Sequence, residues 1–384
     1  MTSPSATLAG RLARWASGLT PTREDLGLAT RSLRDTLAVT IAARNDDICA
    51  VVAESSEPLR WASIGHALDF DDLHMPSTTH ISVVCVPAVL ACGGDARCYL
   101  AAAGVMARLG TALGWPHYAR GWHATCTAGA PAAAVGAGLA LGLDEEALAV
   151  ALALAVPAAG GVQQAFGTAA KPLQVGFAAD AGVRAARLAA HGAGAEPAAF
   201  DQWFALMAGT AERIDLDGPA IPGGLAVKLF PCCYAAQRPI SAVRELVGRH
   251  LRADDVARVL VRTPSATIQP LLHSRPVTGF QAKFSLEYAV ATALVDEYPD
   301  VHSFTDEAVG RVPVRELAGR VEVHASPGGD GLLAGELDLE LTLADGSTTR
   351  TTLALPPAPR AVRQPTPNSI ARSRTVSVMR TPAC

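Results

Sequence analysis

The sequence predicts a mostly α-helical protein, with a large all-helical domain at residues 1–213 and a smaller α+β domain at residues 214–355. Up to about residue 213, Ala, Leu, Gly and Val dominate and polar residues recur at helical spacing. Later stretches alternate between apolar and polar residues with period two, which is typical of strands. Between these halves, Gly218–Gly224 is rich in Pro and Gly, which indicates a boundary. A chain of 384 residues is also long for a single core.

Two helices are most clearly marked in the first half. Acidic residues at 144–146 precede Ala147–Val156, as expected for the N-cap and first turn of a helix. Lys171–His191 predicts another helix, and its many small residues allow close packing of neighbouring helices. The longest apolar run, Ala147–Val162, has sixteen residues and is interrupted by Pro and Gly, so it falls short of the ~20 residues needed to span a bilayer.

The second half predicts a sheet with helices beside it. Strands are predicted at Val256–Thr263, Arg320–His324, Leu337–Leu343 and Thr349–Leu355. The segment Ala344–Thr348 predicts a hairpin turn between the last two strands, and helices are predicted at Pro239–Leu251 and Phe284–Glu297. Residues 356–384 are rich in Pro, Arg and Ser without periodicity and predict an irregular C-terminal tail.

Charge and cysteine usage exclude several classes of function. The formal net charge of −4 gives no general attraction to nucleic acid or an anionic membrane, so we expect a small-molecule partner. The eight cysteines show neither C-x-x-C pairs nor the spacing of a secreted disulfide framework. The N-terminus lacks the basic and apolar regions of a secretion signal. These features together predict a cytoplasmic location.

A dense cluster of ionisable residues occupies His66–His80, in a chain that is otherwise poor in charge. Its members are His66, Asp69, Asp71, Asp72, His74 and His80. Close carboxylates raise one another's pKa and imidazoles titrate near neutrality, so such a cluster can supply both a proton acceptor and a proton donor. The structural alternative is a helix N-terminus at which the acids favour the dipole and the histidines pack against loops.

Several motifs, in order along the chain, resemble the MmgE/PrpD family. They are His66–Asp72, Gly121–Thr125, Phe166–Thr168, Lys171–Gly176, Lys228–Cys233 and Thr278–Tyr288. Each short motif alone is weak, but their order over about residues 25 to 355 makes the resemblance specific. The family includes 2-methylcitrate dehydratase, cis-aconitate decarboxylase and iminodisuccinate epimerase.

The resemblance implies a helical domain with a smaller α+β lid domain, a homodimer, and a pocket that needs neither a metal nor an organic cofactor. It also implies the residues of that pocket. The implied catalytic residues are Asp69, His80, His123, Lys171, Lys228 and Tyr288. The implied substrate-binding residues are Lys171, Lys228, Gln174 and His74.

These residue types suit proton transfer at a carbon next to a carboxylate. The two lysines would hold the carboxylates of a small di- or tricarboxylic acid, and nearby cations stabilise the negative charge that builds up in the transition state. His80 or His123 would move the proton while Asp69 orients the site. The expected function is a cofactor-independent lyase, either a dehydratase or a decarboxylase. An epimerase of a dicarboxylate such as iminodisuccinate, or a non-catalytic member of the family, is the alternative.

Other interpretations of the same residues stay open at this point. For Lys171 and Lys228, the alternative interpretation is that they are ordinary lysines at a helix end or in a loop. For Tyr288, the alternative is a core residue whose hydroxyl donates a hydrogen bond to a backbone carbonyl. The Asp and His residues of His66–His80 include enough oxygen and nitrogen atoms to bind a divalent cation. Leu73 and Gln174 replace a common Thr and His of the family, so the substrate is not fixed by the resemblance.

Overall fold

The chain forms two units in the computed structural model, which describes residues 6–247 and 252–356. Unit 1 consists of Met1–Ala67, Asp71–Gln163 and Ala170–Val227. Unit 2 consists of Leu68–Phe70, Gln164–Ala169 and Lys228–Cys384. The sequence boundary was expected after residue 213, whereas unit 1 continues to Val227 and two short segments of the first half belong to unit 2. The predicted irregular tail at 356–384 lies, apart from its first residue, outside the described residues.

Unit 1 is helical throughout its described elements, as predicted. Its helices are α1 (Leu8–Gly18), α2 (Arg23–Ala42), α3 (Ile48–Val51), α4 (Glu57–Ala67), α5 (Ser82–Leu90), α6 (Ala96–Ala119), α7 (Ala124–Ala140), α8 (Glu145–Ala155), α9 (Ala170–Ala190) and α10 (Ala198–Leu206). The two helices expected near 147–156 and 171–191 are α8 and α9. Asp144 is the N-cap of α8, and its side chain accepts a hydrogen bond from the Ala147 N–H.

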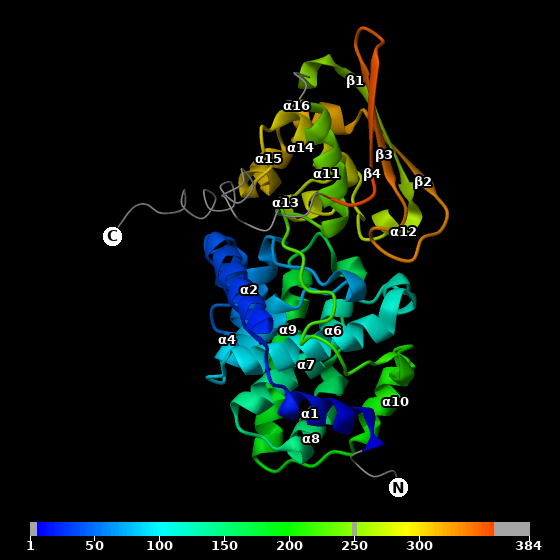
Figure 1. The fold of residues 1–384 in the computed structure, drawn as a ribbon. Coiled ribbons are helices and arrows are strands. Elements are labelled where there is room, and N and C mark those ends of the chain that lie inside the picture. Colours follow the sequence, from blue (N-terminus) through cyan, green and yellow to red (C-terminus); the bar gives the residue numbers. More distant parts are fainter. Residues whose placement is uncertain (1–5, 248–251, 357–384) are drawn as a thin grey trace. The chain divides into compact units, whose positions relative to one another are not determined.

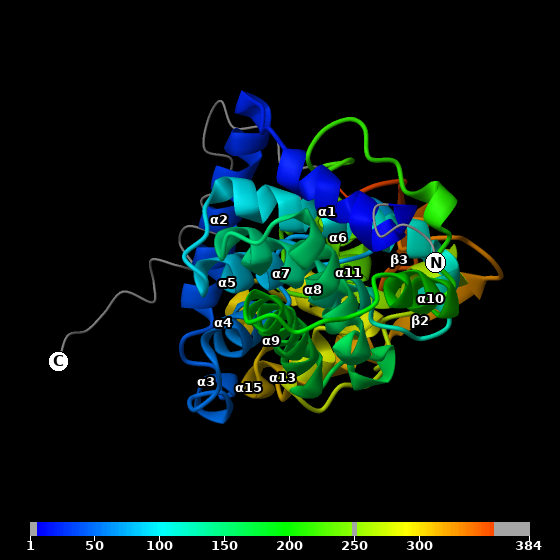
Figure 2. The same ribbon diagram turned by 90° about the horizontal axis from the view of Figure 1, so that it is seen from below.

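Helix α7 lies at the centre of unit 1, where it packs against α5, α6, α8 and α9 (Figures 1 and 2). Its residues from Ala124 to Gly138 are buried, and most of them are small, so the surrounding helices approach closely. Helix α9 also packs on α4. At Gly176 of α9, an added Cβ would lie 2.2 Å from Ser63 Oγ and 2.7 Å from Leu59 O of α4. A glycine is therefore needed for the close α4–α9 contact.

Unit 2 contains a four-stranded mixed sheet with the strand order β2-β1-β3-β4. The strands are β1 (Val256–Pro264), β2 (Val321–Ser326), β3 (Leu337–Leu343) and β4 (Thr348–Leu353). Strand β1 pairs in parallel with β2 and antiparallel with β3, and β3 and β4 form the expected hairpin. The helices are α11 (Tyr234–Val247), α12 (Ser265–Ile268), α13 (Gly279–Ala282), α14 (Leu286–Val295), α15 (Asp306–Val309) and α16 (Val312–Ala318).

One face of this sheet is covered by helices. Leu337, Leu339 and Leu341 of β3 are fully buried, and the residues between them are partly exposed. Helix α11 packs on β3 and β4, while α14 packs on β2 and on α11 (Figure 1). The described structure therefore confirms the predicted fold class, with a larger helical part and a smaller α+β part.

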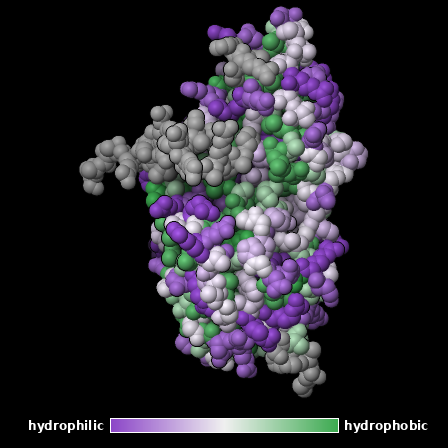
Figure 3. All heavy atoms as spheres, viewed as in Figure 1, coloured by the Kyte–Doolittle hydropathy of each residue, from purple (hydrophilic) through white to green (hydrophobic). Residues whose placement is uncertain are grey.

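The face of unit 1 seen in Figure 3 is dominated by hydrophilic and intermediate residues, with hydrophobic ones scattered among them. Most of the described alanines of unit 1 are buried instead. Among the described residues, every helix is too short or too polar to cross a membrane.

Candidate active site

Three predicted site residues lie where helices of unit 1 begin. His80 precedes the first residue of α5 by two positions, His123 is the N-cap of α7, and Lys171 is the second residue of α9. The three helices pack on one another. His80 is tied to α7 because its backbone N–H donates to Thr125 Oγ1 at 3.0 Å. Helix N-termini carry partial positive charge, so this part of unit 1 favours an anion.

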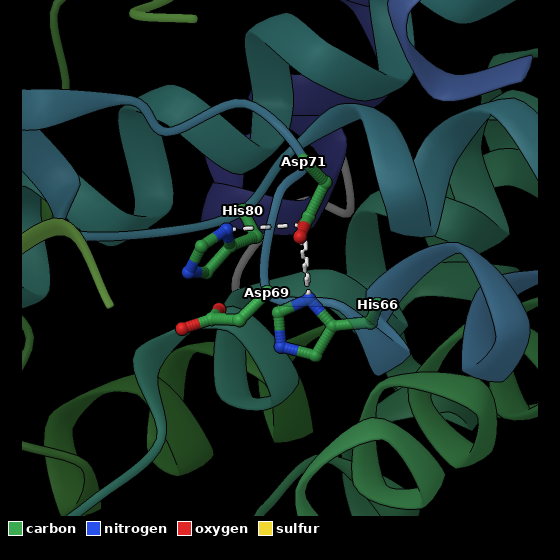
Figure 4. A group of neighbouring side chains, drawn as sticks. All are labelled: His66, Asp69, Asp71 and His80. Carbon is green, nitrogen blue, oxygen red and sulfur yellow. Dashed lines mark hydrogen bonds and ion pairs between the residues drawn. The ribbon is translucent and has the colours of Figure 1, made fainter. Parts of the chain in front are cut away.

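Asp71 holds two imidazoles in this region (Figure 4). Its Oδ2 lies 2.9 Å from His66 Nδ1 and 3.1 Å from His80 Nδ1. His80 Nδ1 also lies 2.9 Å from the backbone oxygen of Asp72. With Nδ1 held in this way, the His80 ring directs Nε2 away from Asp71 (Figure 4). The side chain of His80 is 11% exposed, compared with 0% for His66 and 1% for Asp71, so His80 is the member that a solute can reach.

His66, which was not among the predicted site residues, connects this pair to Lys171. Lys171 Nζ lies 2.5 Å from His66 Nε2, while His66 Nδ1 contacts Asp71 on the other side of the ring. The His66 ring also lies edge-on to His80 at 4.7 Å and nearly parallel to His123 at 6.1 Å, measured between ring centroids. His66 and Asp71 could have been selected from the dense motif, but its sequence does not show which of its members face inward.

Electrostatics keep Asp71 ionised and His66 neutral. Burial alone would raise the pKa of Asp71, but electrostatic attraction to the His66 and His80 rings, together with their hydrogen bonds, outweighs burial and holds this pKa well below its usual range. Burial lowers the pKa of His66 to about 4, and the nearby charge of Lys171 adds to this although Asp71 opposes it. A neutral His66 beside an ionised Asp71 is consistent with both shifts.

Asp72 anchors the start of α5. Its carboxyl group accepts hydrogen bonds from the backbone N–H and the hydroxyl of Ser82, and Ser82 Oγ lies 2.8 Å from Tyr99 Oη. Burial raises the pKa of Asp72 to about 7, with further increases from the charges of Asp35 and Asp71. Because its backbone oxygen also contacts His80, Asp72 fixes both the ring of His80 and the helix that follows it.

His123 and Gln174 meet at one loop. The backbone N–H of His123 donates to Gly161 O at 2.9 Å, and Gln174 Oε1 accepts from the backbone N–H of Val162 at 2.6 Å. Gly161 has a φ of 130°, and an added Cβ would lie 2.4 Å from Gln174 Oε1. Cys126 Sγ lies 3.2 Å from His123 Nδ1, and burial raises the pKa of this thiol. Gln174, predicted to bind substrate, thus supports the loop beside His123.

His74, also predicted to bind substrate, is held by the protein through both ring nitrogens. Its Nδ1 lies 2.6 Å from Ser77 Oγ, and its Nε2 lies 2.6 Å from the backbone oxygen of Pro222. Burial lowers its pKa, which favours the neutral ring. These contacts are typical of a structural histidine, and the predicted substrate-binding role of His74 stays a prediction.

Asp69 and Lys228 form a buried ion pair within unit 2. Lys228 Nζ donates to the side chain of Asp69 at 3.0 Å and to its backbone oxygen at 2.6 Å. Lys228 is 1% exposed and Asp69 is 2% exposed. Asp69 has a φ of 49°, which is uncommon for a residue with a Cβ and is often associated with functional sites. The structure thus brings together two of the predicted residues here, and His80, His123 and Lys171 in unit 1.

Tyr288 lies in the core of unit 2. Its hydroxyl donates to the backbone oxygen of Ser303 at 2.7 Å, which is the structural alternative considered for it from the sequence. Burial raises the pKa of this hydroxyl, so it stays protonated. Tyr288 also contributes to the wall of a cavity of about 810 Å³ in unit 2, together with Arg275 and Arg315. The predicted catalytic role of Tyr288 stays a prediction.

A cation at this cluster would compete with contacts that the protein already makes. The candidate ligand atoms of His66, Asp71 and His80 lie within 4.8 Å of one another. However, Asp71 bonds both imidazoles directly, and the second nitrogen of His66 contacts the ammonium group of Lys171. A metal ion would have to displace these hydrogen bonds and lie near a positive charge. The donor set therefore fits proton transfer better than metal binding.

Comparison with known proteins agrees with the resemblance found in the sequence. The model of the MmgE/PrpD N-terminal domain matches residues 59–216, and that of the MmgE/PrpD C-terminal domain matches residues 230–364. The cis-aconitate decarboxylase of Homo sapiens is 29% identical over 198 residues, which cover 47% of this chain and 40% of that protein. The cis-aconitate decarboxylase of Aspergillus terreus is 25% identical over 408 residues, with 94% and 81% covered. The chain thus spans less than half of the human relative's length and most of the fungal one's.

The two domain models together match most of the chain in the expected order. They include the His66–Asp72 motif, the N-terminus of α7 and the Lys171 motif, which are the segments that build the cluster in unit 1. The chain belongs to the MmgE/PrpD family.

Proposed function

We propose that this chain is a cofactor-independent lyase that transfers a proton at a carbon next to a carboxylate of a small di- or tricarboxylic acid. The observation that carries this proposal is the arrangement around Asp71, in which a buried carboxylate holds His80 by Nδ1 and Lys171 lies one imidazole away. The family match and the relatives named cis-aconitate decarboxylase support a reaction of this type.

His80 is the proposed general base and acid. Asp71 accepts from Nδ1–H and thereby fixes the tautomer with a lone pair on Nε2, since a neutral imidazole has one donor and one acceptor. Once Nε2 takes a proton, the negative charge of Asp71 stabilises the imidazolium that forms. A positioned histidine of this kind contributes roughly 10²–10⁴ to a rate.

Lys171 is the proposed site for a substrate carboxylate. A charge-assisted hydrogen bond contributes roughly 1.5–3 kcal/mol, and the N-termini of α5, α7 and α9 favour the same negative charge. Removal of a proton next to a carboxylate moves negative charge onto that group. Cationic groups there consequently stabilise the transition state more than the ground state, as catalysis requires.

The two lyase reactions use the proton differently. In dehydration, the base takes a proton from carbon, the electron pair of that C–H bond forms the C=C bond, and the hydroxyl on the neighbouring carbon leaves as water after protonation. In decarboxylation of an unsaturated acid, the C–CO₂⁻ bond breaks, CO₂ leaves, and the electron pair is captured by a proton on carbon. The names of the relatives favour decarboxylation of an acid such as cis-aconitate as the first reaction to test.

One assay separates these reactions. The purified protein is incubated in deuterated water with citrate, 2-methylcitrate, cis-aconitate or iminodisuccinate, and the products are identified by NMR. A decarboxylation product carrying one deuteron per turnover, or an unsaturated acid released with water, supports the proposal. Deuterium exchange with inversion and without loss of CO₂ or water would replace it by the epimerase alternative. Absence of turnover and of exchange with all four acids would contradict it.

A further inference from the structure

His66 is fully buried and contacts two ionisable side chains, one at each ring nitrogen. It lies on α4, contacts Lys171 of α9 at Nε2, and contacts Asp71 at Nδ1. We infer that His66 is a positioning residue that joins Lys171 to the Asp71–His80 pair, accepting a hydrogen bond at Nε2 while donating one from Nδ1. This inference rests on the proposed function, in which His80 transfers the proton.

The chemistry of the two neighbours determines the tautomer of His66. An ionised carboxylate only accepts hydrogen bonds, and an ammonium group only donates them. His66 lies between one of each, at 2.9 Å from Asp71 and 2.5 Å from Lys171. A neutral imidazole with its proton on Nδ1 satisfies both. The other tautomer would place a lone pair against the carboxylate and an N–H against the ammonium group, in a side chain with no exposed area.

The contact between two helices sets up this arrangement. Gly176 lies about one and a half turns after Lys171 on α9. Because it has no side chain, α4 packs so close that a Cβ at this position would overlap Ser63 and Leu59. Ser63 is one turn before His66 on α4, so the close approach brings His66 and Lys171 together although they are 105 residues apart in the chain. The contact is thus built into the packing of unit 1.

The consequence is a shared charge. Lys171 polarises the His66 ring by donating a hydrogen bond to its Nε2, and this strengthens the hydrogen bond from His66 Nδ1 to Asp71. Part of the negative charge of Asp71 therefore acts on His66, and less of it acts on His80. Less of the negative charge of Asp71 then stabilises a proton on Nε2 of His80, the atom that acts as the proposed base. Removal of His66 from this chain would leave Asp71 to His80 alone, and the pKa of His80 would rise.

Other ionisable groups lie close to the same rings. The His123 ring lies beside that of His66, and Cys126 of α7 contacts His123. The Asp72 carbonyl contacts His80, and the charge of Asp35 on α2 acts on the Asp72 carboxyl group. Lys171 of α9 is also close, because its positive charge acts to lower the pKa of the Cys126 thiol, which burial raises. Substitutions at His66 leave all of these groups in the protein, so changes in pH profile can be compared with a common background.

The first test uses the unmodified full chain and needs no substrate. Histidine residues are labelled with ¹⁵N, and the ring nitrogens are recorded between about pH 6 and pH 8. The His66 ring is identified by the signals that vanish in His66→Gln, and we expect it to have a protonated Nδ1, a bare Nε2 and no titration in this range. A His66 ring that carries its proton on Nε2, or that is doubly protonated at pH 7, would overturn the inference.

The second test measures the pH dependence of kcat/KM in two variants. In His66→Leu the acid limb should move to higher pH by about one unit, because Asp71 then stabilises protonated His80 more strongly. His66→Gln, which offers both a donor and an acceptor, should restore part of the original profile. An acid limb that stays in place in folded His66→Leu would contradict the inference.

A buried histidine elsewhere in unit 1 provides the matched control. His117 is fully buried and bonded through both ring nitrogens, to Thr127 Oγ1 at 3.0 Å and to the Met207 backbone oxygen at 2.9 Å. His117→Gln should lower stability and leave the acid limb in place. If none of the test acids reacts with the wild-type protein, the proposed function fails, while the NMR test still decides the state of His66. If turnover is found but His66 has the other tautomer, the inference fails alone.

Discussion

Asp69 and Asp71 are two residues apart in the sequence, are both buried, and have different kinds of partner. Asp69 of unit 2 accepts hydrogen bonds directly from the Lys228 ammonium group, through both its carboxylate and its backbone oxygen. Asp71 of unit 1 is hydrogen-bonded to two imidazoles, and Lys171 contacts the second ring nitrogen of one of them, His66. A direct ion pair fixes charge and geometry, whereas imidazoles can gain and lose protons near pH 7. Two carboxylates of one short motif therefore differ in kind: Asp69 belongs to a fixed charge pair, and Asp71 contacts groups that can exchange protons.

The largest effect on activity is expected at His80. In His80→Ala, kcat/KM should fall by about 10²–10⁴, because the proposed base is lost while Asp71 and His66 stay in place. Steady-state kinetics with the acid that the NMR assay identifies provides the measurement. His302, an exposed histidine of unit 2, is the control, and His302→Ala should leave kcat/KM unchanged. Wild-type rates in His80→Ala would remove His80 from the mechanism.

The largest effect on stability is expected from breaking the direct pair. Lys228→Met leaves the Asp69 carboxylate buried without its ammonium partner, and should cost about 3–5 kcal/mol in the free energy of unfolding. Lys171→Met should cost less, since Asp71 keeps both imidazoles as donors. Denaturant unfolding of the three proteins provides the comparison. The double variant with Asp69→Asn should recover part of the loss, and equal losses in the single and double variants would contradict the direct coupling.

A smaller effect concerns pH. The folded-state pKa of Asp72 is raised to about 7, so its contribution to stability is present at low pH and is lost as the pH rises through 7. His66 acts in the opposite direction, because its pKa is lowered to about 4 and its contribution is lost as the pH falls below 6.5. In Asp72→Asn the contribution of Asp72 is removed, while that of His66 remains. Between pH 7 and pH 5 this variant should therefore lose about 2–3 kcal/mol more than the wild type. Parallel unfolding curves at the two pH values would show that Asp72 does not carry this proton.

The smallest effect is expected at Tyr288. Tyr288→Phe removes one hydrogen bond to Ser303 and should lower the free energy of unfolding by about 1 kcal/mol, with kcat/KM essentially unchanged. Unfolding and steady-state rates measured on the same preparation check both statements. A fall in kcat/KM of about 100-fold or more with normal stability would instead support the catalytic role implied by the family resemblance.

Local patterns in the sequence were enough to predict the fold class and most elements of unit 2. The four strands and helices α8, α9, α11 and α14 lie close to their predicted positions, because their patterns of apolar residues have the period of the secondary structure itself. The motifs that suggested the family also lie inside the matched domains. The pairing of Asp69 with Lys228 could not be predicted from such patterns, since the two residues are 159 positions apart.

What the sequence by itself determined is the secondary structure, the family and the pool of ionisable residues in His66–His80. Tertiary packing decided how that pool is used: it assigns Asp71 to two imidazoles, places His74 in structural hydrogen bonds, and brings Lys171 to His66 through the α4–α9 contact at Gly176. The physical reason is that hydrogen bonds and burial act over a few ångströms, and only the packed helices determine which distant residues come that close.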